Sequence, residues 1–301
     1  MYSLRQVQRG LKHPGLAGRE VNRLFHTRLK QRDFNTSGVD VFEEDWDVML
    51  VLDACRYDMF EEISDMEGGL ETHTSRGSST IGWLRGNFRD RDLTDTVYVT
   101  SNPQLEWNRE KIRPRLHAEV NLWGEEWSEE HNTVLPEDVT RRAVEAGEEY
   151  PEKRMLVHYM QPHFPFVADE VPEELEGLEL EDMFWNAMME DRYGLSREEV
   201  WRLYRENLER ALPHVEEAAE EIRGKTVVTA DHGNMVGERS SPVPTREWGH
   251  PQGVFTRELV EVPWMVLEGE RREVRGGESV DEGGEVDEEE VRDRLQALGY
   301  E

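Results

Sequence analysis

The chain has 301 residues, of which 36% are hydrophobic, and this content supports one large core or at most two modest ones. Its formal net charge of −30 at pH 7 excludes nucleic acid as an expected partner, because phosphate contacts need a basic surface. The single cysteine, Cys55, excludes disulfide bonds within the chain.

Residues 1–40 predict a polar, helical arm that is interrupted near Pro14. The arm is the one basic stretch of an acidic chain. Two interpretations fit that charge: the arm binds an anionic partner, or it packs on the acidic body, which we favour.

A folded body is predicted for residues 41–268. Short apolar, β-branched runs alternate there with helical stretches, a pattern typical of a mostly parallel sheet covered on both faces. The strand-like runs are 47–53, 96–100, 154–160, 225–230 and 262–267, and the helices are 136–150 and 196–223. We therefore expect an α/β fold with a mostly parallel sheet sandwiched between helices.

Residues 269–301 predict an acidic, Gly-rich linker and then a short amphipathic helix at 288–298. No apolar run of the sequence approaches the roughly 20 residues that span a bilayer, and the start lacks a signal-peptide core. We expect a cytoplasmic protein with no integral membrane segment, and its oligomeric state stays open.

The balance of charged residues indicates adaptation to salt. Acidic residues number 66, and only five of the 36 basic residues are lysine. Such a surface repels itself at low ionic strength, whereas the Debye length shrinks to about 3 Å at 1 M salt. A disordered acidic protein is disfavoured by nine tryptophans and by the strand-like runs. We expect a folded halophilic protein.

Two of the strand-like runs stop abruptly at an aspartate. The run 47-DVMLVLDACRYD-58 reaches Asp53, and the run 225-KTVVTADHGNMVGE-238 reaches Asp231 and His232. Ends of buried parallel strands meet at one edge of a sheet. Carboxylates and an imidazole are ligands suited to a divalent cation. Either run alone fits an ordinary core strand equally well, but together they predict a metal site.

Four motifs, in this order, resemble the sulfatase-like branch of the alkaline phosphatase superfamily. They are Asp53 after its strand, the segment from His158 to Phe166, Asp231-His232-Gly233, and Gly249-His250-Pro251, with a closing strand at 262–267. The resemblance covers residues 45–268 and implies an alkaline-phosphatase-like α/β/α fold. It also implies that Asp53, Asp231 and His232 bind one divalent metal ion, whether Mn, Zn, Mg or Ca. Members of the superfamily that bind a second metal use an Asp-x-x-x-His motif in mid-chain. This sequence has no such motif near 150–170, so a second metal is not expected.

The resemblance places a nucleophile within 74-TSRGSSTIGWLRGNF-88, at the start of an early helix. Gly77 permits a tight turn there, and a helix N-terminus suits a phosphate or sulfate. Three hydroxyls, Ser78, Ser79 and Thr80, lie within one turn. The spacing of Ser78 to the following Trp-Leu pair resembles that of the threonine nucleophile in lipoteichoic-acid-synthase-type members. Ser78 is therefore favoured, Thr80 is the alternative, and Ser79 or Thr80 is expected to cap the helix.

Two histidines receive roles from the same resemblance, and a third is interpreted from its place in a strand. His163 and His250 are expected to stabilise phosphoryl oxygens or to protonate a leaving group. Outside this pattern each would more often be structural. His158 is expected to lie within its strand as a packing residue.

The nucleophile restricts the chemistry. A sulfatase of this branch needs Cys-x-Pro-x-Arg, which the sequence lacks, whereas a hydroxyl beside a cation suits phosphoryl transfer. The resemblance thus implies a metal-dependent hydrolase or transferase that acts on a small-molecule, glycan or lipid phosphate ester. Phosphomonoesters and phosphodiesters both fit. The alternatives are a non-catalytic member that uses the cleft for binding, and a sulfatase with an atypical nucleophile.

Overall fold

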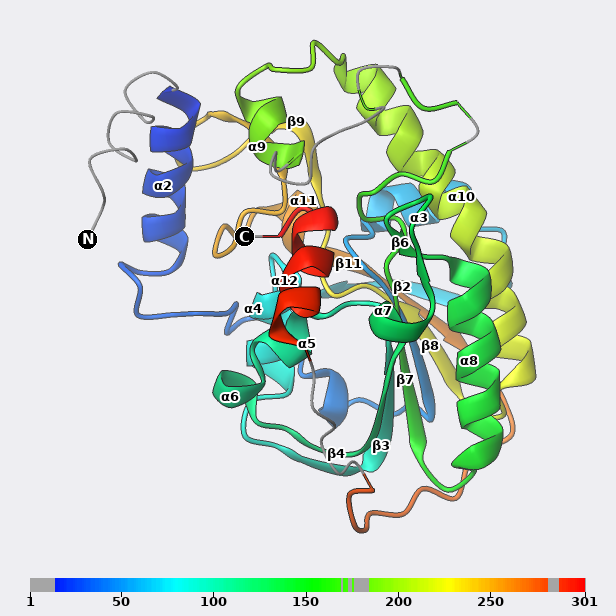
Figure 1. The fold of residues 1–301 in the computed structure, drawn as a ribbon. Helices are drawn as coiled ribbons and strands as arrows, with labels where there is room; N and C mark the ends of the chain where they lie inside the picture. Colours follow the sequence, from blue (N-terminus) through cyan, green and yellow to red (C-terminus); the bar gives the residue numbers. More distant parts are fainter. Residues whose placement is uncertain (1–13, 169, 173–174, 176–183, 281–286, 301) are drawn as a thin grey trace.

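The computed structural model describes residues 14–168, 170–172, 175, 184–280 and 287–300. Its centre is a seven-stranded sheet built from β1 (Val48–Leu52), β2 (Gly69–Thr74), β3 (Asp92–Thr100), β4 (Arg115–Asn121), β7 (Arg154–Tyr159), β8 (Thr226–Thr229) and β11 (Glu261–Leu267). The strand order is β2-β11-β8-β1-β7-β3-β4 (Figure 1). The strands from β8 to β4 run parallel, and β11 is antiparallel to both β8 and β2.

Helices cover both faces of the sheet. On one face lie α3 (Tyr57–Ile63), α8 (Pro136–Glu149) and α10 (Arg197–Glu221), and on the other lie α4 (Thr80–Asn87), α5 (Gln104–Trp107) and α6 (Arg109–Ile112) (Figure 1). The predicted α/β fold, a mostly parallel sheet sandwiched between helices, is confirmed. The sequence pattern did not predict β2 and β4, which are the two edge strands.

The remaining elements lie outside the central sheet, most of them toward its carboxyl edge (Figure 1). They are η1 (Val41–Glu43), α2 (Pro14–His26), α7 (Leu122–Glu125), α9 (Phe184–Met189), α11 (Arg257–Val260), α12 (Glu288–Ala297), β5 (Trp127–Ser128), β6 (Thr133–Val134), β9 (Met235–Arg239) and β10 (Arg246–Gly249). Among the described residues, no helix combines the length and apolarity needed to cross a membrane.

The predicted division into an arm (1–40), a body (41–268) and a linker with a helix (269–301) stays a prediction. Residues 1–13 of that arm and 281–286 of that linker lie outside the described residues. The described part of the arm holds α2 (Pro14–His26).

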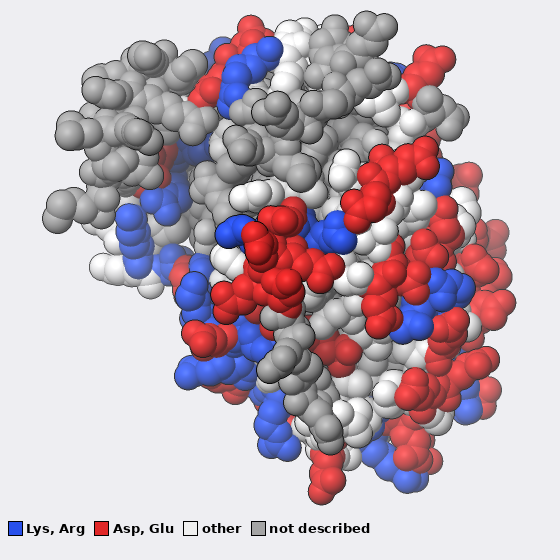
Figure 2. All heavy atoms as spheres, viewed as in Figure 1, with Lys and Arg blue, Asp and Glu red and all other residues white. Residues whose placement is uncertain are grey.

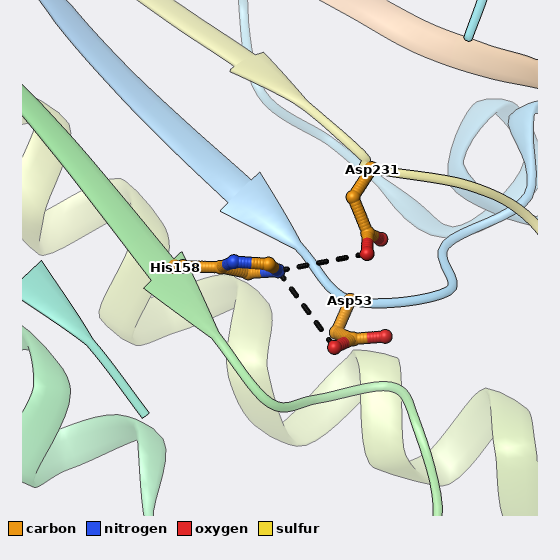
Figure 3. Close-up of side chains that lie close together, drawn as sticks. All are labelled: Asp53, His158 and Asp231. Atoms are coloured by element: carbon orange, nitrogen blue, oxygen red, sulfur yellow. Dashed lines mark ion pairs between the residues drawn. The ribbon is translucent and has the colours of Figure 1, made fainter. Parts of the chain in front are cut away.

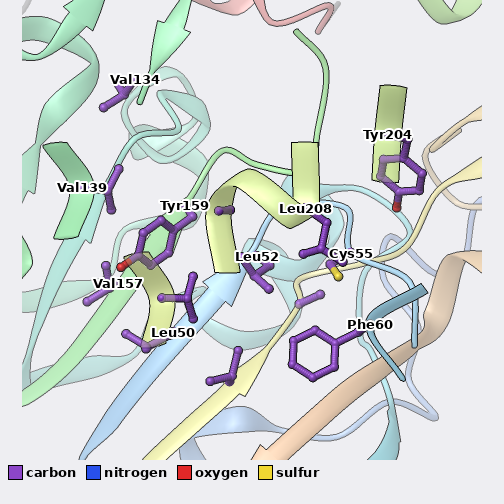
Figure 4. Packing of buried hydrophobic residues seen from close by; sticks show 14 of the residues in the cluster. Leu50, Leu52, Cys55, Phe60, Val134, Val139, Val157, Tyr159, Tyr204 and Leu208 are labelled. Atoms are coloured by element: carbon purple, nitrogen blue, oxygen red, sulfur yellow. The ribbon is translucent and has the colours of Figure 1, made fainter. Parts of the chain in front are cut away.

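The core has two halves, one on each side of the sheet, and β1 contributes to both. Its alternate residues Val48, Leu50 and Leu52 pack with α8 and α10, as Figure 4 shows for the two leucines. Met49 and Val51 point to the opposite half, against α4. Every side chain of β1 is therefore buried, which explains the uninterrupted apolar run of its sequence.

Acidic side chains dominate much of the surface, and arginines are interspersed among them (Figure 2). Many of these arginines form ion pairs with neighbouring acids, such as Arg271 with Asp45 at 2.7 Å and Arg202 with Glu206 at 2.8 Å. Exposed pairs of this kind contribute little free energy each, so the net negative charge remains the dominant property of the surface.

Candidate active site

Asp53 and Asp231 lie together at the carboxyl edge of the sheet. Asp53 follows β1 directly, Asp231 lies two residues beyond β8, and the pairing of Val51 with Thr229 sets these strand ends side by side. Both aspartates are fully buried. The chain turns sharply after Asp53, where Ala54 has a φ of 62°, and the Ala54 N–H donates to Oδ1 of Asp231 over 3.0 Å.

Two histidines face this pair of carboxylates. His158, on β7, places its Nε2 3.7 Å from Asp53 Oδ2 and 3.8 Å from Asp231 Oδ2 (Figure 3). His232 places its Nε2 3.6 Å from Asp53 Oδ1 and 3.3 Å from Asp231 Oδ2. One ligand atom from each of Asp53, His158 and Asp231 lies within 4.8 Å of the other two, a separation that one cation can bridge. His158, expected as a packing residue, thus joins the candidate ligands.

The orientation of His232 is set by its neighbour. Its Nδ1 donates to the carbonyl of Gly233 over 2.8 Å, which leaves the lone pair of Nε2 directed toward the carboxylates. Gly233 itself allows a close approach of backbone, because a Cβ at this position would lie 2.1 Å from the carbonyl oxygen of Glu258. Glycine is therefore required at this position of the Asp-His-Gly motif, because any side chain would clash with the backbone at Glu258.

The electrostatics of the cluster favour a bound cation. Burial and then the charge of Asp231 raise the pKa of Asp53 well above its ordinary value. Burial lowers the pKa of His158 to about 4, so this imidazole is neutral at pH 7. Oδ1 of Asp53, Oδ2 of Asp231 and Nε2 of His158 are buried and find no hydrogen-bond partner among the described residues. Such unpaired groups cost about 1–3 kcal/mol each or more, and a divalent cation would satisfy all three.

Thr80 is the hydroxyl that faces the cluster. It is the first residue of α4, and its Oγ1 lies 3.3 Å from Asp53 Oδ2 and 3.4 Å from His232 Nε2. The loop before α4 is tied to the segment that follows β8, because Ser75 Oγ donates to the carbonyl of Asp231. This bond holds the loop that leads to Thr80 beside the aspartate itself.

Ser78, favoured as the nucleophile from the sequence, turns away from the carboxylates. Its hydroxyl donates to the carbonyl of Pro251 over 3.1 Å and accepts the N–H of Gly253 over 2.9 Å. Ser79 holds the N-cap position of α4, but its buried hydroxyl caps no N–H and finds no partner in the described part of the chain. The turn needs Gly77, where a Cβ would lie 2.6 Å from the N of Trp83.

His163 and His250 border the cluster and contact each other. Their Nε2 atoms lie 2.7 Å apart, and the ring of His250 lies 4.7 Å from that of His232. The backbone N–H of His163 donates to the backbone carbonyl of Asp53, which fixes the segment after β7 to the end of β1. Burial lowers the pKa of His163 to about 3 and that of His250 well below its ordinary value, so both rings are neutral.

Two further residues of the site were missed from the sequence. Asn102, two residues after β3, donates its Nδ2 to Asp53 Oδ2 over 2.6 Å. The sequence predicts a strand at 96–100, so a polar residue just after that strand, such as Asn102, could have been recognised as a candidate for the site. Tyr300 also donates to Asp53 Oδ2, over 3.0 Å, and no feature of the sequence indicated that contact.

No protein-family model matches this chain, and no curated protein matches it. Solved structures similar to it include the zinc complex of the C-terminal periplasmic domain of EptC from Escherichia coli (TM-score 0.48, 12% identity, covering 74% of this chain and 72% of that chain). A second is the C-terminal periplasmic domain of the phosphoethanolamine transferase EptC from Campylobacter jejuni (TM-score 0.48, 13% identity, 73% and 78% covered).

A third similar structure is a protein of the alkaline phosphatase superfamily from Vibrio parahaemolyticus (TM-score 0.42, 12% identity, 93% of this chain and 75% of that chain covered). At these scores and identities the likenesses transfer no chemistry, so the site is interpreted from its own residues.

Proposed function

We propose that this chain is a metal-dependent enzyme that acts on phosphate esters, as a hydrolase or a transferase, with Thr80 as its nucleophile. The observation that carries the proposal is the position of Thr80 Oγ1, which lies 3.3 Å from Asp53 Oδ2 at the N-terminus of α4. A hydroxyl there is next to unpaired carboxylate oxygens and to backbone N–H groups that suit a phosphate.

Each side chain of the site has a distinct role in this proposal. Asp53, Asp231 and His232 hold one divalent cation, with His158 as an additional ligand. When bound, the cation supplies Lewis-acid stabilisation and lowers the pKa of a neighbouring hydroxyl. Thr80 Oγ1 passes its proton to Asp53 Oδ2 as it bonds to phosphorus, and the bond to the leaving oxygen breaks with its electron pair going to that oxygen. Water or an acceptor alcohol then takes the phosphoryl group from Thr80. The neutral rings of His163 and His250 line the same position. Nδ1–H of His163 donates to the carbonyl of Phe164, so the proton available for a phosphoryl oxygen is that on Nε2 of His250, which donates to His163 Nε2 in the closed site.

Sulfate-ester chemistry with a cysteine nucleophile has no support in this structure. Cys55 is fully buried and packs in the core with Phe60 and Tyr204 (Figure 4). Burial raises the pKa of its thiol well above the ordinary value, which keeps the thiolate scarce at neutral pH. The hydroxyl of Thr80 is therefore the better nucleophile, and phosphate esters are the better substrates.

One observation favours the alternative, a non-catalytic protein of this fold. Thr80 and Asp53 are fully buried, so the site is closed to substrate as it stands. Hydrolysis of p-nitrophenyl phosphate and of its bis-ester, in molar KCl with Mn²⁺, Zn²⁺, Mg²⁺ or Ca²⁺, separates the two. We expect turnover that a chelator abolishes and that Asp231→Asn lacks. Phosphate binding without any turnover would favour the non-catalytic alternative.

A further inference from the structure

The side chain of Tyr300 occupies the space directly in front of Thr80. Its hydroxyl lies 3.0 Å from Thr80 Oγ1, 3.0 Å from Asp53 Oδ2 and 3.0 Å from Asn102 Nδ2. Reacting atoms in a productive complex lie about 3–3.5 Å apart. The phosphoryl group that Thr80 would attack therefore needs the position that the Tyr300 hydroxyl holds.

The ring of Tyr300 fills the space beside that hydroxyl. It is stacked on His163, with ring centroids 5.0 Å apart and an interplanar angle of 8°. It also meets the ring of His250 edge to face at 5.6 Å. Both histidines that would contact phosphoryl oxygens are thus covered by one aromatic side chain, which is itself only 7% exposed.

The end of α12 directs Tyr300 into the site. Gly299 follows the helix with a φ of 78°, and its N–H donates to the carbonyl of Gln296 over 2.9 Å. The N–H of Tyr300 donates to the carbonyl of Leu295 over 2.9 Å. This pair of bonds is a Schellman motif, in which a left-handed glycine reverses the chain. The reversal turns the tyrosine back under the helix, toward the carboxyl edge of the sheet.

The helix is held by a small, separate group of contacts. Val291, Leu295 and Leu298 pack with Trp123 and Met160 in a cluster apart from the two main core halves. A cluster of this size can open locally at a lower free energy than the whole fold.

One arginine adds to this attachment, and the outer face of the helix is charged. Arg294 lies 4.5 Å above the ring of Trp127 and pairs with Glu129 at 3.1 Å. The outer face begins with Glu288, Glu289 and Glu290, and Figure 2 shows acidic side chains gathered over this helix. The outer face thus keeps its charges in solvent and leaves the inner face to hold the helix in place.

We propose that residues 288–300 form an autoinhibitory strap, with Tyr300 occupying the substrate position in front of Thr80. The proposal rests on the proposed function for the identity of the excluded ligand, a phosphate ester or inorganic phosphate. A ligand binds only the fraction of molecules whose strap is open, so its apparent affinity equals the intrinsic affinity multiplied by that fraction. The strap accordingly sets the fraction of molecules whose site is open to ligand.

A competing role for Tyr300 is that of a catalytic hydroxyl, and two substitutions separate the roles. Tyr300→Ala removes both ring and hydroxyl but keeps the backbone N–H that closes the Schellman motif. Tyr300→Phe keeps the ring and loses only the hydroxyl. Under the strap proposal both variants are more open than the parent, and the alanine variant is the more open. Under the catalytic role both variants lose turnover.

The experiment has one readout that needs neither metal nor turnover. Ethoxycarbonylation of His163 by diethyl pyrocarbonate on the full chain, located by mass spectrometry of its peptides, reports how often the covered ring becomes accessible. The second readout is kcat/KM for p-nitrophenyl phosphate with Mn²⁺. Arg292→Ala, on the exposed face of the same helix, is the control and should match the parent.

We expect His163 labelling and kcat/KM to rise about tenfold in Tyr300→Ala, as for a parent that is open about a tenth of the time. Tyr300→Phe should fall between Tyr300→Ala and the parent. Unchanged labelling in Tyr300→Ala would overturn the strap, and so would lost turnover in Tyr300→Phe with unchanged labelling. If labelling follows the expected order while no variant hydrolyses the ester, the strap stands and the proposed function fails.

Discussion

The N–H of Gly253 donates to the hydroxyl oxygen of Ser78, over 2.9 Å and across 175 positions of sequence. The same hydroxyl donates its proton to the carbonyl of Pro251. Ser78 is therefore committed to the loop that follows His250 and fixes that loop on the turn before α4. This leaves Thr80 as the hydroxyl of the turn that faces the carboxylates.

Substitution of the two hydroxyls should give opposite outcomes. Thr80→Ala should lower turnover about 10³-fold or more, as expected when a covalent nucleophile is removed. Thr80→Ser keeps a hydroxyl and should retain measurable turnover. Ser78→Ala should keep most of the turnover and lose about 1–2 kcal/mol of unfolding free energy, because Gly253 N–H and Pro251 O lose their partner. Steady-state kinetics and urea titrations measure both quantities. Loss of turnover in Ser78→Ala alone would restore Ser78 as the nucleophile.

His158 should prove to be a metal ligand rather than a packing residue. Calorimetric titration of His158→Phe, which preserves a ring of similar shape, should show Mn²⁺ or Zn²⁺ affinity reduced by about tenfold or more. Tyr98→Phe is the matched control, because it removes only the hydroxyl that lies 2.8 Å from His158 Nδ1. That control should lose less affinity. Equal metal affinity in His158→Phe and in the parent would return His158 to a packing role.

Added metal should stabilise the folded state, because the buried carboxylates of Asp53 and Asp231 bind it only when they are together. Saturating the site at about 100 times the dissociation constant should add about 2.7 kcal/mol to the unfolding free energy. Chelation should reverse the gain, and Asp231→Asn should show almost none of it. Melting curves with and without Mn²⁺ provide the measurement.

The sequence predicted those elements whose surroundings impose a clear pattern on their residues. β1 and β8 are buried on both faces, so their sequences are continuous apolar runs. The long helix α10 begins with a capping box between Ser196 and Glu199, which its sequence displays openly. In contrast, β2 is an edge strand with mostly exposed side chains, so its sequence carries no strand pattern.

The same reasoning separates the site residues that the sequence could predict from those that it could not. The positions of Asp53 and Asp231 follow from two strand ends that share an edge. The choice between Ser78 and Thr80 depends on side-chain directions within one turn, which spacing alone does not determine. Tyr300 lies beyond the last motif, and its contact with Thr80 arises from the way α12 ends, so no local pattern could connect them.

Salt should stabilise the fold strongly. With a net charge of −30, repulsion among surface carboxylates falls as salt shortens the Debye length from about 10 Å at 0.1 M to about 3 Å at 1 M. We expect the melting temperature to rise steeply between those concentrations of KCl. A melting temperature that does not change over this range would contradict the halophilic interpretation.

Acid should weaken the fold in part through Glu238. Burial acts to raise the pKa of this carboxyl, but the charge and hydrogen bond of Arg56 outweigh burial and lower the pKa below its ordinary value. Arg197 of α10 also pairs with Glu238, at 2.9 Å. Because the folded-state pKa is depressed, the stabilisation is fully present above the unfolded-state pKa and is lost as pH falls through the folded-state value.

The corresponding measurement compares the parent with Glu238→Gln. Urea titrations between about pH 6 and pH 3 should show the parent more stable at the upper end, with the difference shrinking as the carboxyl becomes protonated. A difference that stays constant across this range would mean that the ion pair of Glu238 with Arg56 contributes no pH-dependent stability.

The adjacency of β1 and β8 has a consequence for how the chain folds. These strands are neighbours in the sheet, yet β7 and α10 lie between them in the sequence, and 177 positions separate Ala54 from Asp231. Closing so large a loop is a slow step. A partly folded chain in which β1 has paired only with β7 offers a cation one carboxylate instead of two. In small zinc domains the metal drives folding, but here it would bind only after the sheet is complete. Bound metal would therefore slow the unfolding of this protein and would not speed its folding.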